Sequence, residues 1–201
     1  MPELIVASDF TVNPETGLIE PARLCLSPNR DERPANASLD AIVLHGISLP
    51  PRQFGGNEVE ALFLNKLDWN AHPYFAEIRG MQVSAHLLIR RDGELLQFVP
   101  FNERAWHAGE SFFRGRRCCN DFSIGIELEG DDETPYDERQ YLRLPAVLQA
   151  LFLAYPGLSA RELAGHCDVA PGRKSDPGPA FDWLRLYDAL GDTNQSSNSC
   201  T

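Results

Sequence analysis

The stretch AIVLHG, residues 41–46 of the 201-residue chain, decides the fold. Four consecutive apolar residues, followed by His45 and Gly46, suit a short buried strand. Such a strand carries His45 at its C-terminal end, where a side chain can face a cleft. We therefore expect residues 41–46 to form one strand of a central sheet.

Two further segments predict strands of the same sheet. SAHLLIRRDGELLQFVP, residues 84–100, holds two apolar stretches around Asp92-Gly93, which favours a hairpin because both turn residues tolerate positive φ. FSIGIELEG, residues 122–130, alternates, so that Ile124 and Ile126 point to one side. The other side would carry residues that are harder to place in a core: Ser123, Gly125, Glu127 and Glu129.

Apolar residues at helical spacing predict that the longest helix begins at Thr134 and ends at Pro156-Gly157. Pro145 lies inside it and favours a kink or two helical pieces, since an interior proline costs about 3 kcal/mol or more. Shorter helices are expected at 57–65, 159–164 and 179–190. This alternation of strands and helices indicates a mixed α/β fold around a central sheet.

The chain is long enough to bury one core, and neither an internal repeat nor a long linker divides it. We expect a single domain over residues 1–190, followed by a flexible tail over 191–201. Residues 28–40 combine proline, asparagine and charge without apolar periodicity, and we expect them to be loose as well. A monomer is the simplest prediction for such a domain.

Composition limits the partners and the compartment. The 18 Lys and Arg against 29 Asp and Glu give a net charge of −11, which disfavours nucleic acid and anionic membranes as partners. No apolar run reaches the roughly 18–20 residues of a membrane span, and MPELIVASDF at the N-terminus lacks the pattern of a signal peptide. The 5 cysteines, with a vicinal pair at 118 and 119, are a poor basis for a disulfide framework. Together these observations predict a cytoplasmic protein.

Two histidines stand out because each follows an apolar segment at the edge of a glycine-containing turn: His45 in LHG and His166 in AGHC. With Asp176 they would offer two imidazoles and one carboxylate, a set that suits zinc with one open position and also suits non-haem Fe(II). The prolines and glycines of residues 170–179 favour a rigid extended loop, in which Lys174 and Asp176 would project to the same side. The alternative is a surface turn with a solvated Lys–Asp pair, together with histidines that are merely structural.

Four segments, in this order, resemble a known family: IVLHGISLPPRQFGG (42–56), HPYFAEIRGMQVSAHLLIRRDGELLQFVPFNERAWHAG (72–109), CNDFSIGIELEG (119–130) and GHCDVAPGRKSDPGPAFDW (165–183). Over about residues 4–190 the chain resembles the zinc-dependent N-acetylmuramoyl-L-alanine amidases, in particular the cytoplasmic members of peptidoglycan recycling that act on 1,6-anhydro-muropeptides. The resemblance implies the fold shared with peptidoglycan recognition proteins: a mostly antiparallel central sheet flanked by helices.

The resemblance also implies a role for individual residues. One Zn²⁺ per chain would be bound by His45, His166 and Asp176. Glu127, ahead of Glu129 in GIELEG, would transfer the proton, and Lys174 would stabilise the oxyanion together with zinc. The small-molecule substrate would be a muropeptide, cut at the amide between its lactyl group and L-alanine.

Further residues would contact the substrate by the same resemblance. Trp106 and His107, in RAWHAG, would line the substrate cleft, whereas His72 and His86 are interpreted as structural. The residues themselves add the loop FRGRRCCND, which places Arg114, Arg116 and Arg117 together. These arginines could bind the carboxylates of a stem peptide, or they could belong to a merely solvated loop. The chain departs from the family at two positions, with Gly46 in place of an asparagine and Cys118 in place of an arginine. We expect Arg116 or Arg117 to replace that arginine.

Three other functions remain as alternatives. A non-catalytic muropeptide-binding module would have no use for the full ligand set with Glu127 and Lys174. An amidase that cuts intact peptidoglycan would act outside the membrane, which the predicted cytoplasmic location disfavours. An Fe(II) oxygenase shares the ligand types and would need oxygen for activity.

Overall fold

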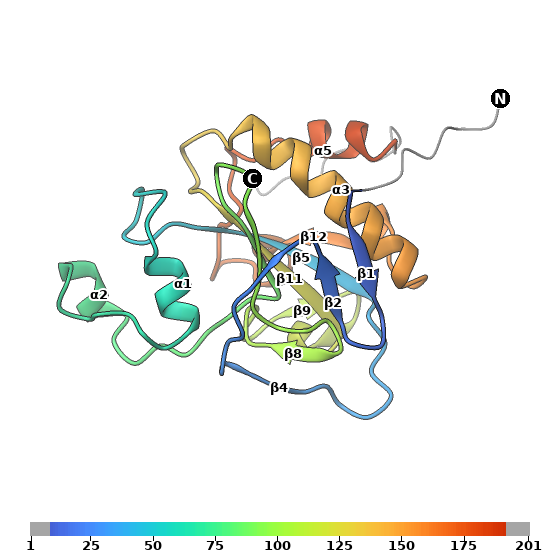
Figure 1. The fold of residues 1–201 in the computed structure, drawn as a ribbon, viewed down its shortest axis with the longest axis horizontal. Helices are drawn as coiled ribbons and strands as arrows, with labels where there is room; N and C mark the ends of the chain where they lie inside the picture. Colours follow the sequence, from blue (N-terminus) through green and yellow to red (C-terminus); the bar gives the residue numbers. More distant parts are fainter. Residues whose placement is uncertain (1–8, 192–201) are drawn as a thin grey trace.

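The computed structural model describes residues 9–191, which form a central sheet flanked by helices (Figure 1). The six strands of this sheet lie in the order β12-β5-β11-β6-β7-β3. Their bounds are Leu163–Gly165, Ala41–Ile47, Ser123–Glu129, Leu87–Ile89, Leu95–Gln97 and Arg23–Leu24. All three strand segments expected from the sequence are therefore present, and β5 and β11 lie side by side near the middle.

The direction of the strands differs from the expectation of a mostly antiparallel sheet. Only β6 and β7 pair antiparallel, and the other four pairings of the sheet are parallel. The reason is the connections: β6 and β7 are joined by the hairpin at Asp92-Gly93, whereas long crossovers join the other neighbours. The mixed α/β class with helices around a sheet is confirmed.

Smaller two-stranded sheets decorate this core. Within residues 9–191 they are β1 with β2, β4 with β8, and β9 with β10. Their bounds are Thr11–Asn13 and Leu18–Glu20, Arg30–Glu32 and Glu103–Ala105, and Phe112–Phe113 and Arg116–Arg117. The expectation that residues 28–40 are loose is wrong in its first half, because β4 pairs with β8 and Arg33 donates to the carbonyls of Phe101, Asn120, Asp121 and Ser123. The tail over 191–201 lies, apart from Gly191, outside the described residues.

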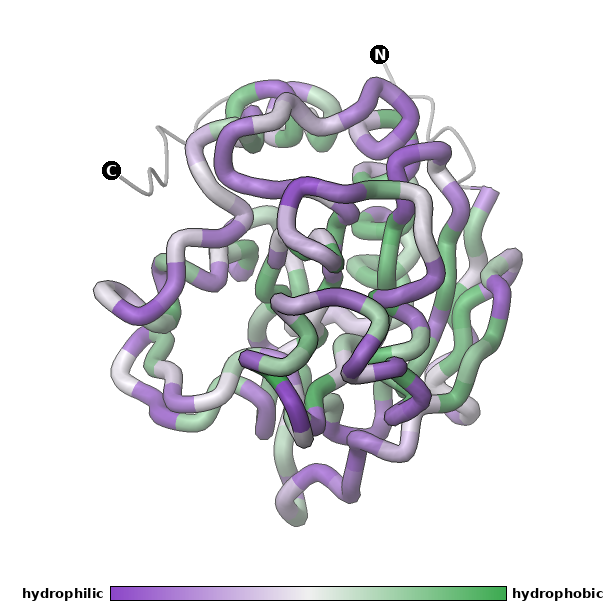
Figure 2. Tube along the Cα trace, turned by 90° about the vertical axis from the view of Figure 1, so that its left-hand side faces the viewer, coloured by the Kyte–Doolittle hydropathy of each residue, from purple (hydrophilic) through white to green (hydrophobic). Residues whose placement is uncertain are grey.

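Helices cover both faces of the sheet. Helix α3 (Glu138–Ala154) and α5 (Trp183–Ala189) pack on one face, while α1 (Glu58–Phe63) and α2 (Pro73–Glu77) lie together on the other (Figure 1). The short α4 (His166–Val169), η1 (Cys119–Asp121) and η2 (Ala160–Glu162) complete the described helical elements. Figure 2 shows the hydrophobic residues gathered in the central strands and the hydrophilic ones in the surrounding loops.

The expected helices are present with shifted ends. Helix α3 starts at Glu138 instead of Thr134, because Asp137 caps it in a reciprocal capping box with Gln140. It runs without a break through Pro145, which is buried, so the second of the two alternatives, a helix in two pieces, is wrong. Helix α1 matches the predicted 57–65, α5 begins later than the predicted 179, and 159–164 forms η2 followed by β12.

The two faces of β5 and β11 differ in character. Ile42 and Leu44 of β5, like Ile124 and Ile126 of β11, belong to the core beneath α3. The alternate residues face the opposite side, toward a cleft.

Among the helices of residues 9–191, none has the length and apolar character that a membrane span requires.

Candidate active site

Strand register brings the three principal chemical groups to one level of the sheet. Glu127 of β11 is the direct partner of His45 in β5. On the other side of β5, Gly165 of β12 is paired with Leu44, so His166, the next residue, lies level with His45. His45 thus stands between His166 and Glu127, although the three residues are far apart in the sequence.

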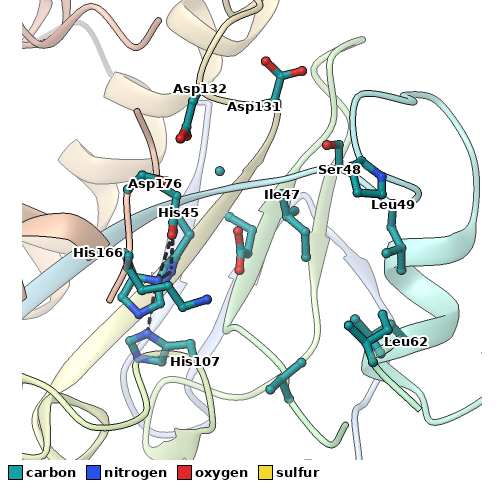
Figure 3. A pocket seen from close by; sticks show the side chains of 18 of the residues that line it. His45, Ile47, Ser48, Leu49, Leu62, His107, Asp131, Asp132, His166 and Asp176 are labelled. Carbon is teal, nitrogen blue, oxygen red and sulfur yellow. Dashed lines mark hydrogen bonds and ion pairs between the residues drawn. The ribbon is translucent and has the colours of Figure 1, made fainter. Parts of the chain in front are cut away.

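The three predicted metal ligands, His45, His166 and Asp176, converge on one point (Figure 3). The Nδ1 atoms of His45 and His166 are 2.9 Å apart, and Asp176 Oδ2 lies 3.0 Å from His166 Nδ1 and 3.3 Å from His45 Nδ1. Neighbouring ligand atoms of a tetrahedral zinc site, with bonds of about 2.0–2.2 Å, are separated by about 3.3 Å. The spacing of the three atoms therefore fits such an ion.

The outer nitrogens of both imidazoles are engaged elsewhere. His166 Nε2 lies 3.2 Å from the carbonyl oxygen of Ala108, and His45 Nε2 lies 2.9 Å from His107 Nδ1. Both rings therefore turn their Nδ1 atoms toward Asp176 and away from these partners. A ligand histidine held through its second nitrogen is the arrangement usually found at metal centres.

Burial and neighbours set the charges of this cluster. Burial lowers the pKa of His45 to about 4. Burial acts to raise the pKa of Asp176, but the hydrogen bonds with His166 and His45 outweigh it, so the pKa lies below its usual range. Neutral imidazole and ionised carboxylate are the forms that bind metal ions.

Glu127 is a buried carboxyl that lacks a full set of partners. Its residue is 8% exposed, and within residues 9–191 no donor reaches its Oε2 atom. Burial, followed by the negative charge of Asp176, raises the pKa of Glu127 well above its usual range, while the charge of Lys174 acts in the opposite direction. A carboxyl of this kind can accept and return a proton near neutral pH.

The loop that carries Asp176 is fixed by Tyr136. The Tyr136 hydroxyl donates to the carbonyl oxygen of Pro177 at 2.9 Å, and a Cβ added to Gly46 would lie 2.3 Å from that hydroxyl oxygen. Gly46, one of the two departures from the family pattern, therefore leaves room for Tyr136 next to the ligands.

The cluster opens into a cavity of about 540 Å³. Trp106 and His107, which were expected in a substrate cleft, line this cavity, and so does Lys174. One wall is apolar and includes residues from α1, α2 and the loop after α2: Leu62, Phe63, Tyr74, Ile78 and Met81. The rim beyond β11 is acidic and includes Asp131, Asp132 and Glu133. The cleft thus offers an apolar surface and a charged surface beside the candidate reaction centre.

The structure separates the three predicted arginines. Arg114 pairs with Glu162 at 3.1 Å, and Arg116 pairs with Asp40 at 2.5 Å while it stacks on Phe122. Arg116 therefore does not join the cleft. Arg117 lines a neighbouring cavity together with Arg173, which lines the main cavity as well.

Sequence reasoning missed two residues of the site. Asn120 Oδ1 accepts from the backbone N–H groups of His107 at 3.3 Å and Ala108 at 2.8 Å, and it belongs to the CND segment whose purpose the pattern did not reveal. Arg173 donates to the carbonyls of Ala108 and Glu110. Its position beside Lys174 was the available signal. His72 and His86 are structural as interpreted: His72 caps α2, and His86 accepts from the Gly125 N–H.

Comparisons with known proteins agree with this geometry. A family model described as N-acetylmuramoyl-L-alanine amidase matches residues 35–179. The 1,6-anhydro-N-acetylmuramyl-L-alanine amidase AmpD of Escherichia coli (strain K12) is 56% identical over 172 residues, which cover 86% of this chain and 93% of that protein. A crystal structure of a Se-Met AmpD derivative aligns with a TM-score of 0.85 and 52% identity, covering 89% of this chain and 98% of that one.

A more distant structure contains a ligand. The N-acetylmuramyl-L-alanine amidase AmiD from E. coli, in complex with the substrate anhydro-N-acetylmuramic acid-L-Ala-D-gamma-Glu-L-Lys, aligns with a TM-score of 0.54 and 28% identity. The alignment covers 79% of this chain and 60% of AmiD.

Proposed function

Because the chain belongs to the N-acetylmuramoyl-L-alanine amidase family, we propose that it hydrolyses the amide between an anhydro-N-acetylmuramic acid and L-alanine with the help of zinc. The observation that carries the proposal is the convergence of His45 Nδ1, His166 Nδ1 and Asp176 Oδ2 beside the incompletely paired Glu127. Two imidazoles and one carboxylate are a donor set of catalytic zinc sites.

Zinc held by these residues would polarise the scissile carbonyl and make water a stronger acid. Glu127 would take one proton from the water molecule as the water oxygen attacks the carbonyl carbon. It would then return that proton to the nitrogen of L-alanine as the carbon–nitrogen bond breaks. The raised pKa of Glu127 supports both roles, because the group can hold the proton between the two steps.

Lys174 would act on the carbonyl oxygen. Lys174 lines the cleft, and its positive charge acts to lower the pKa values of both His45 and Glu127. A fixed cation stabilises the negative charge that develops on the oxygen during attack. Lys174 and zinc would thus share this charge, while Glu127 moves the proton.

The anhydro sugar is the proposed substrate form because the similar AmpD proteins carry it in their names and the AmiD complex contains it. A role in peptidoglycan recycling, a cytoplasmic location, a monomeric state and a single domain over residues 1–190 stay predictions. Cell fractionation and sedimentation would test the location and the oligomeric state.

The deciding experiment incubates the purified protein with anhydro-N-acetylmuramoyl tripeptide before and after removal of metal by a chelator, and again after re-addition of zinc or Fe(II). Mass spectrometry follows free sugar and free tripeptide. We expect tripeptide release that is lost with the chelator and restored by zinc without oxygen. Binding of the substrate without cleavage in the presence of zinc would instead identify a muropeptide-binding module.

A further inference from the structure

We propose that His107 is a positioning residue that fixes the ring orientation and the tautomer of His45, so that His45 Nδ1 is free to bind a metal ion. His107 was expected to contact substrate, and it does line the cleft. Its two ring nitrogens, however, both face protein groups: Nδ1 lies 2.9 Å from His45 Nε2, and Nε2 lies 3.2 Å from Ser123 Oγ. The inference rests on the proposed zinc site.

The hydrogen bonds that link Cys119, Ser123, His107 and His45 form a series, and the carbonyl group of Cys119 fixes the direction of each of them. The hydroxyl of Ser123 donates to the carbonyl oxygen of Cys119 at 2.6 Å, and a carbonyl can only accept. With its proton committed there, Ser123 Oγ accepts the N–H at Nε2 of His107. A neutral imidazole has one N–H, so His107 then has a lone pair on Nδ1.

The consequence reaches the ligand. The lone pair on His107 Nδ1 accepts the N–H at Nε2 of His45, which leaves the lone pair of His45 on Nδ1, 3.3 Å from Asp176 Oδ2. A proton on Nδ1 of His45 would block the metal site and leave two lone pairs facing each other between His45 and His107. The series of hydrogen bonds from the Cys119 carbonyl to His45 therefore selects the tautomer of His45 that binds metal.

The fold provides a close-fitting seat for the His107 ring. A Cβ added to Gly125 would lie 2.4 Å from His107 Cγ and 2.6 Å from its Nδ1, so only glycine at this position of β11 admits the ring. The rings of His107 and His45 meet edge to face, with centroids 5.0 Å apart. Ser123 and Gly125, which the sequence pattern left without a purpose, thus both serve His107.

The same backbone segment supports the second ligand. Ala108 follows His107, and its carbonyl oxygen faces His166 Nε2 at 3.2 Å. Asn120 Oδ1 holds both residues through their backbone N–H groups. Residues 107–108 therefore orient the two imidazoles together: His107 through its ring and Ala108 through its carbonyl.

The test compares zinc affinities, measured by competition with a fluorescent chelator, for the wild type and three variants of the chain. His107→Phe keeps an aromatic ring but removes the acceptor, and we expect its zinc affinity to fall about 10–100-fold. His107→Asn places Oδ1 as many bonds from Cα as Nδ1 is in histidine, so affinity should return to within about threefold of the wild type. His72→Asn, which keeps an acceptor at the cap of α2, is the matched control and should bind as the wild type does.

Nuclear magnetic resonance of the ring nitrogens gives a second readout that does not depend on activity. In the zinc-loaded wild type, His107 should carry its proton on Nε2, and in Ser123→Ala this preference should weaken while the protein stays folded. Unchanged zinc affinity in His107→Phe, or a proton on Nδ1 of His107 in the wild type, would overturn the inference and leave the amidase proposal intact. A wild-type protein that binds no zinc would remove the proposed zinc site itself.

Discussion

Two glutamates on the cleft-facing side of β11 are in opposite situations. Glu129 is saturated: its Oε1 accepts from the Gly55 N–H at 2.5 Å, and its Oε2 accepts from the Arg91 N–H at 3.0 Å. Glu127, two residues earlier and similarly buried, has an oxygen that no donor within residues 9–191 reaches. Residue type, strand and face are the same, so the neighbours alone distinguish a carboxylate that holds a loop from one that can exchange a proton.

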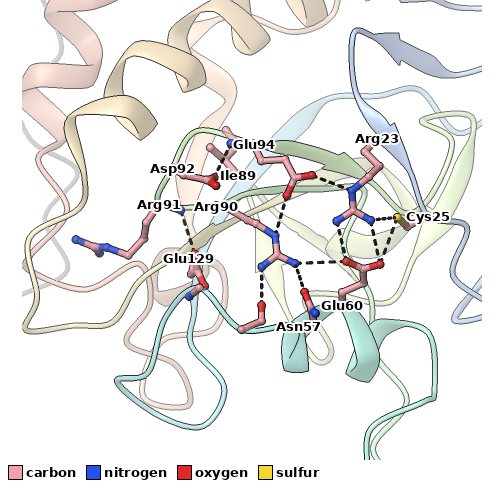
Figure 4. Close-up of polar contacts among 12 residues, drawn as sticks. Arg23, Cys25, Asn57, Glu60, Ile89, Arg90, Arg91, Asp92, Glu94 and Glu129 are labelled. Carbon is pink, nitrogen blue, oxygen red and sulfur yellow. Dashed lines mark hydrogen bonds and ion pairs between the residues drawn. The ribbon is translucent and has the colours of Figure 1, made fainter.

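The surroundings extend this contrast. Around Glu129 a set of ion pairs ties α1 to the β6–β7 hairpin and β3: Glu60 contacts Arg23 at 2.8 Å and Arg90 at 3.3 Å (Figure 4). Glu127 lines the cleft into which the cluster of His45, His166 and Asp176 opens. Figure 3 shows this cluster. At one end of the strand face the charged groups are thus paired with one another, and at the other end Glu127 keeps unused bonding capacity for a ligand.

The largest effect should come from Glu127→Gln, which keeps the shape but cannot accept the proton. We expect kcat to fall about 10²–10⁴-fold, while the zinc content and KM stay close to those of the wild type. Steady-state kinetics with metal analysis measure this. A variant that retains more than about a tenth of the wild-type kcat would show that Glu127 is not the proton carrier.

The thermal stability of Glu127→Gln should also differ from that of the wild type, in a way that depends on pH. Burial raises the pKa of Glu127 in the folded state, so the folded protein holds this proton more tightly than the unfolded chain. Stability of the metal-free protein therefore falls as the pH rises above the unfolded pKa of about 4.3, and the loss is complete above the folded pKa. Metal-free Glu127→Gln should thus melt at a higher temperature than the wild type at pH 8, with a smaller difference at pH 4.

Glu129→Ala should mainly lower stability, whereas Glu127→Gln should mainly lower activity. Removal of the carboxylate leaves two backbone N–H groups without their acceptor, at about 1–3 kcal/mol each, so the melting temperature should fall on the order of 10 °C. The kcat of the protein that remains folded should change much less than in Glu127→Gln. Thermal melts of both variants, together with steady-state kinetics at low temperature, measure the two effects. Equal loss of activity in both variants without loss of stability would contradict the prediction.

A smaller effect concerns the loop of Asp176. Gly46→Ala should destabilise the protein by about 1–3 kcal/mol, because the new methyl group meets the Tyr136 hydroxyl. Tyr136→Phe alone should cost about 1 kcal/mol through loss of the bond to Pro177. In the double variant the cost of Gly46→Ala should shrink, and urea unfolding of the four proteins measures the coupling. Additive costs would place the strain elsewhere.

The smallest effect is expected at the arginines. Arg117→Ala should raise KM for an anionic tripeptide substrate about 2–5-fold, since exposed charged contacts contribute roughly 0.2–1 kcal/mol. Arg116→Ala is the control: Arg116 pairs with Asp40 away from the cleft, so KM should not move. An equal effect of both substitutions at low and high salt would indicate a general charge effect.

Much of this arrangement was predictable from particular residues. The apolar run before His45, the Asp92-Gly93 turn and the alternation around Ile124 and Ile126 each gave the correct strand, because side-chain periodicity is local. The proximity of His45, His166 and Asp176 was expected from their residue types and from the family resemblance. Strand direction did not follow, since it depends on how long connections pack, and the start of α3 shifted because the cap at Asp137 replaced the one expected at Thr134.

The supporting contacts were beyond a reading of the sequence. The proposed role of His107 depends on Ser123 and Gly125 of β11, and the contacts of Asn120 depend on backbone N–H groups 12 and 13 residues away. Such contacts are set by tertiary packing and leave no periodic pattern. The separation of Arg116 from Arg117 has a different, local origin: the sequence did not predict the short strand β10, in which successive side chains point to opposite sides.

The pairing of β5 with β11 also bears on how such enzymes can diversify. Seven consecutive Cα partners, from Ser123↔Ala41 to Glu129↔Ile47, place Glu127 opposite His45. The insertion or deletion of a single residue before this pair in either strand would turn its side chains to the opposite face of the sheet. We therefore expect insertions and deletions to be tolerated in the segments that connect the strands, such as the β9–β10 hairpin at residues 112–117, and not within β5 or β11. Protein engineers who wish to alter substrate range can lengthen such connections while they leave the two strands untouched.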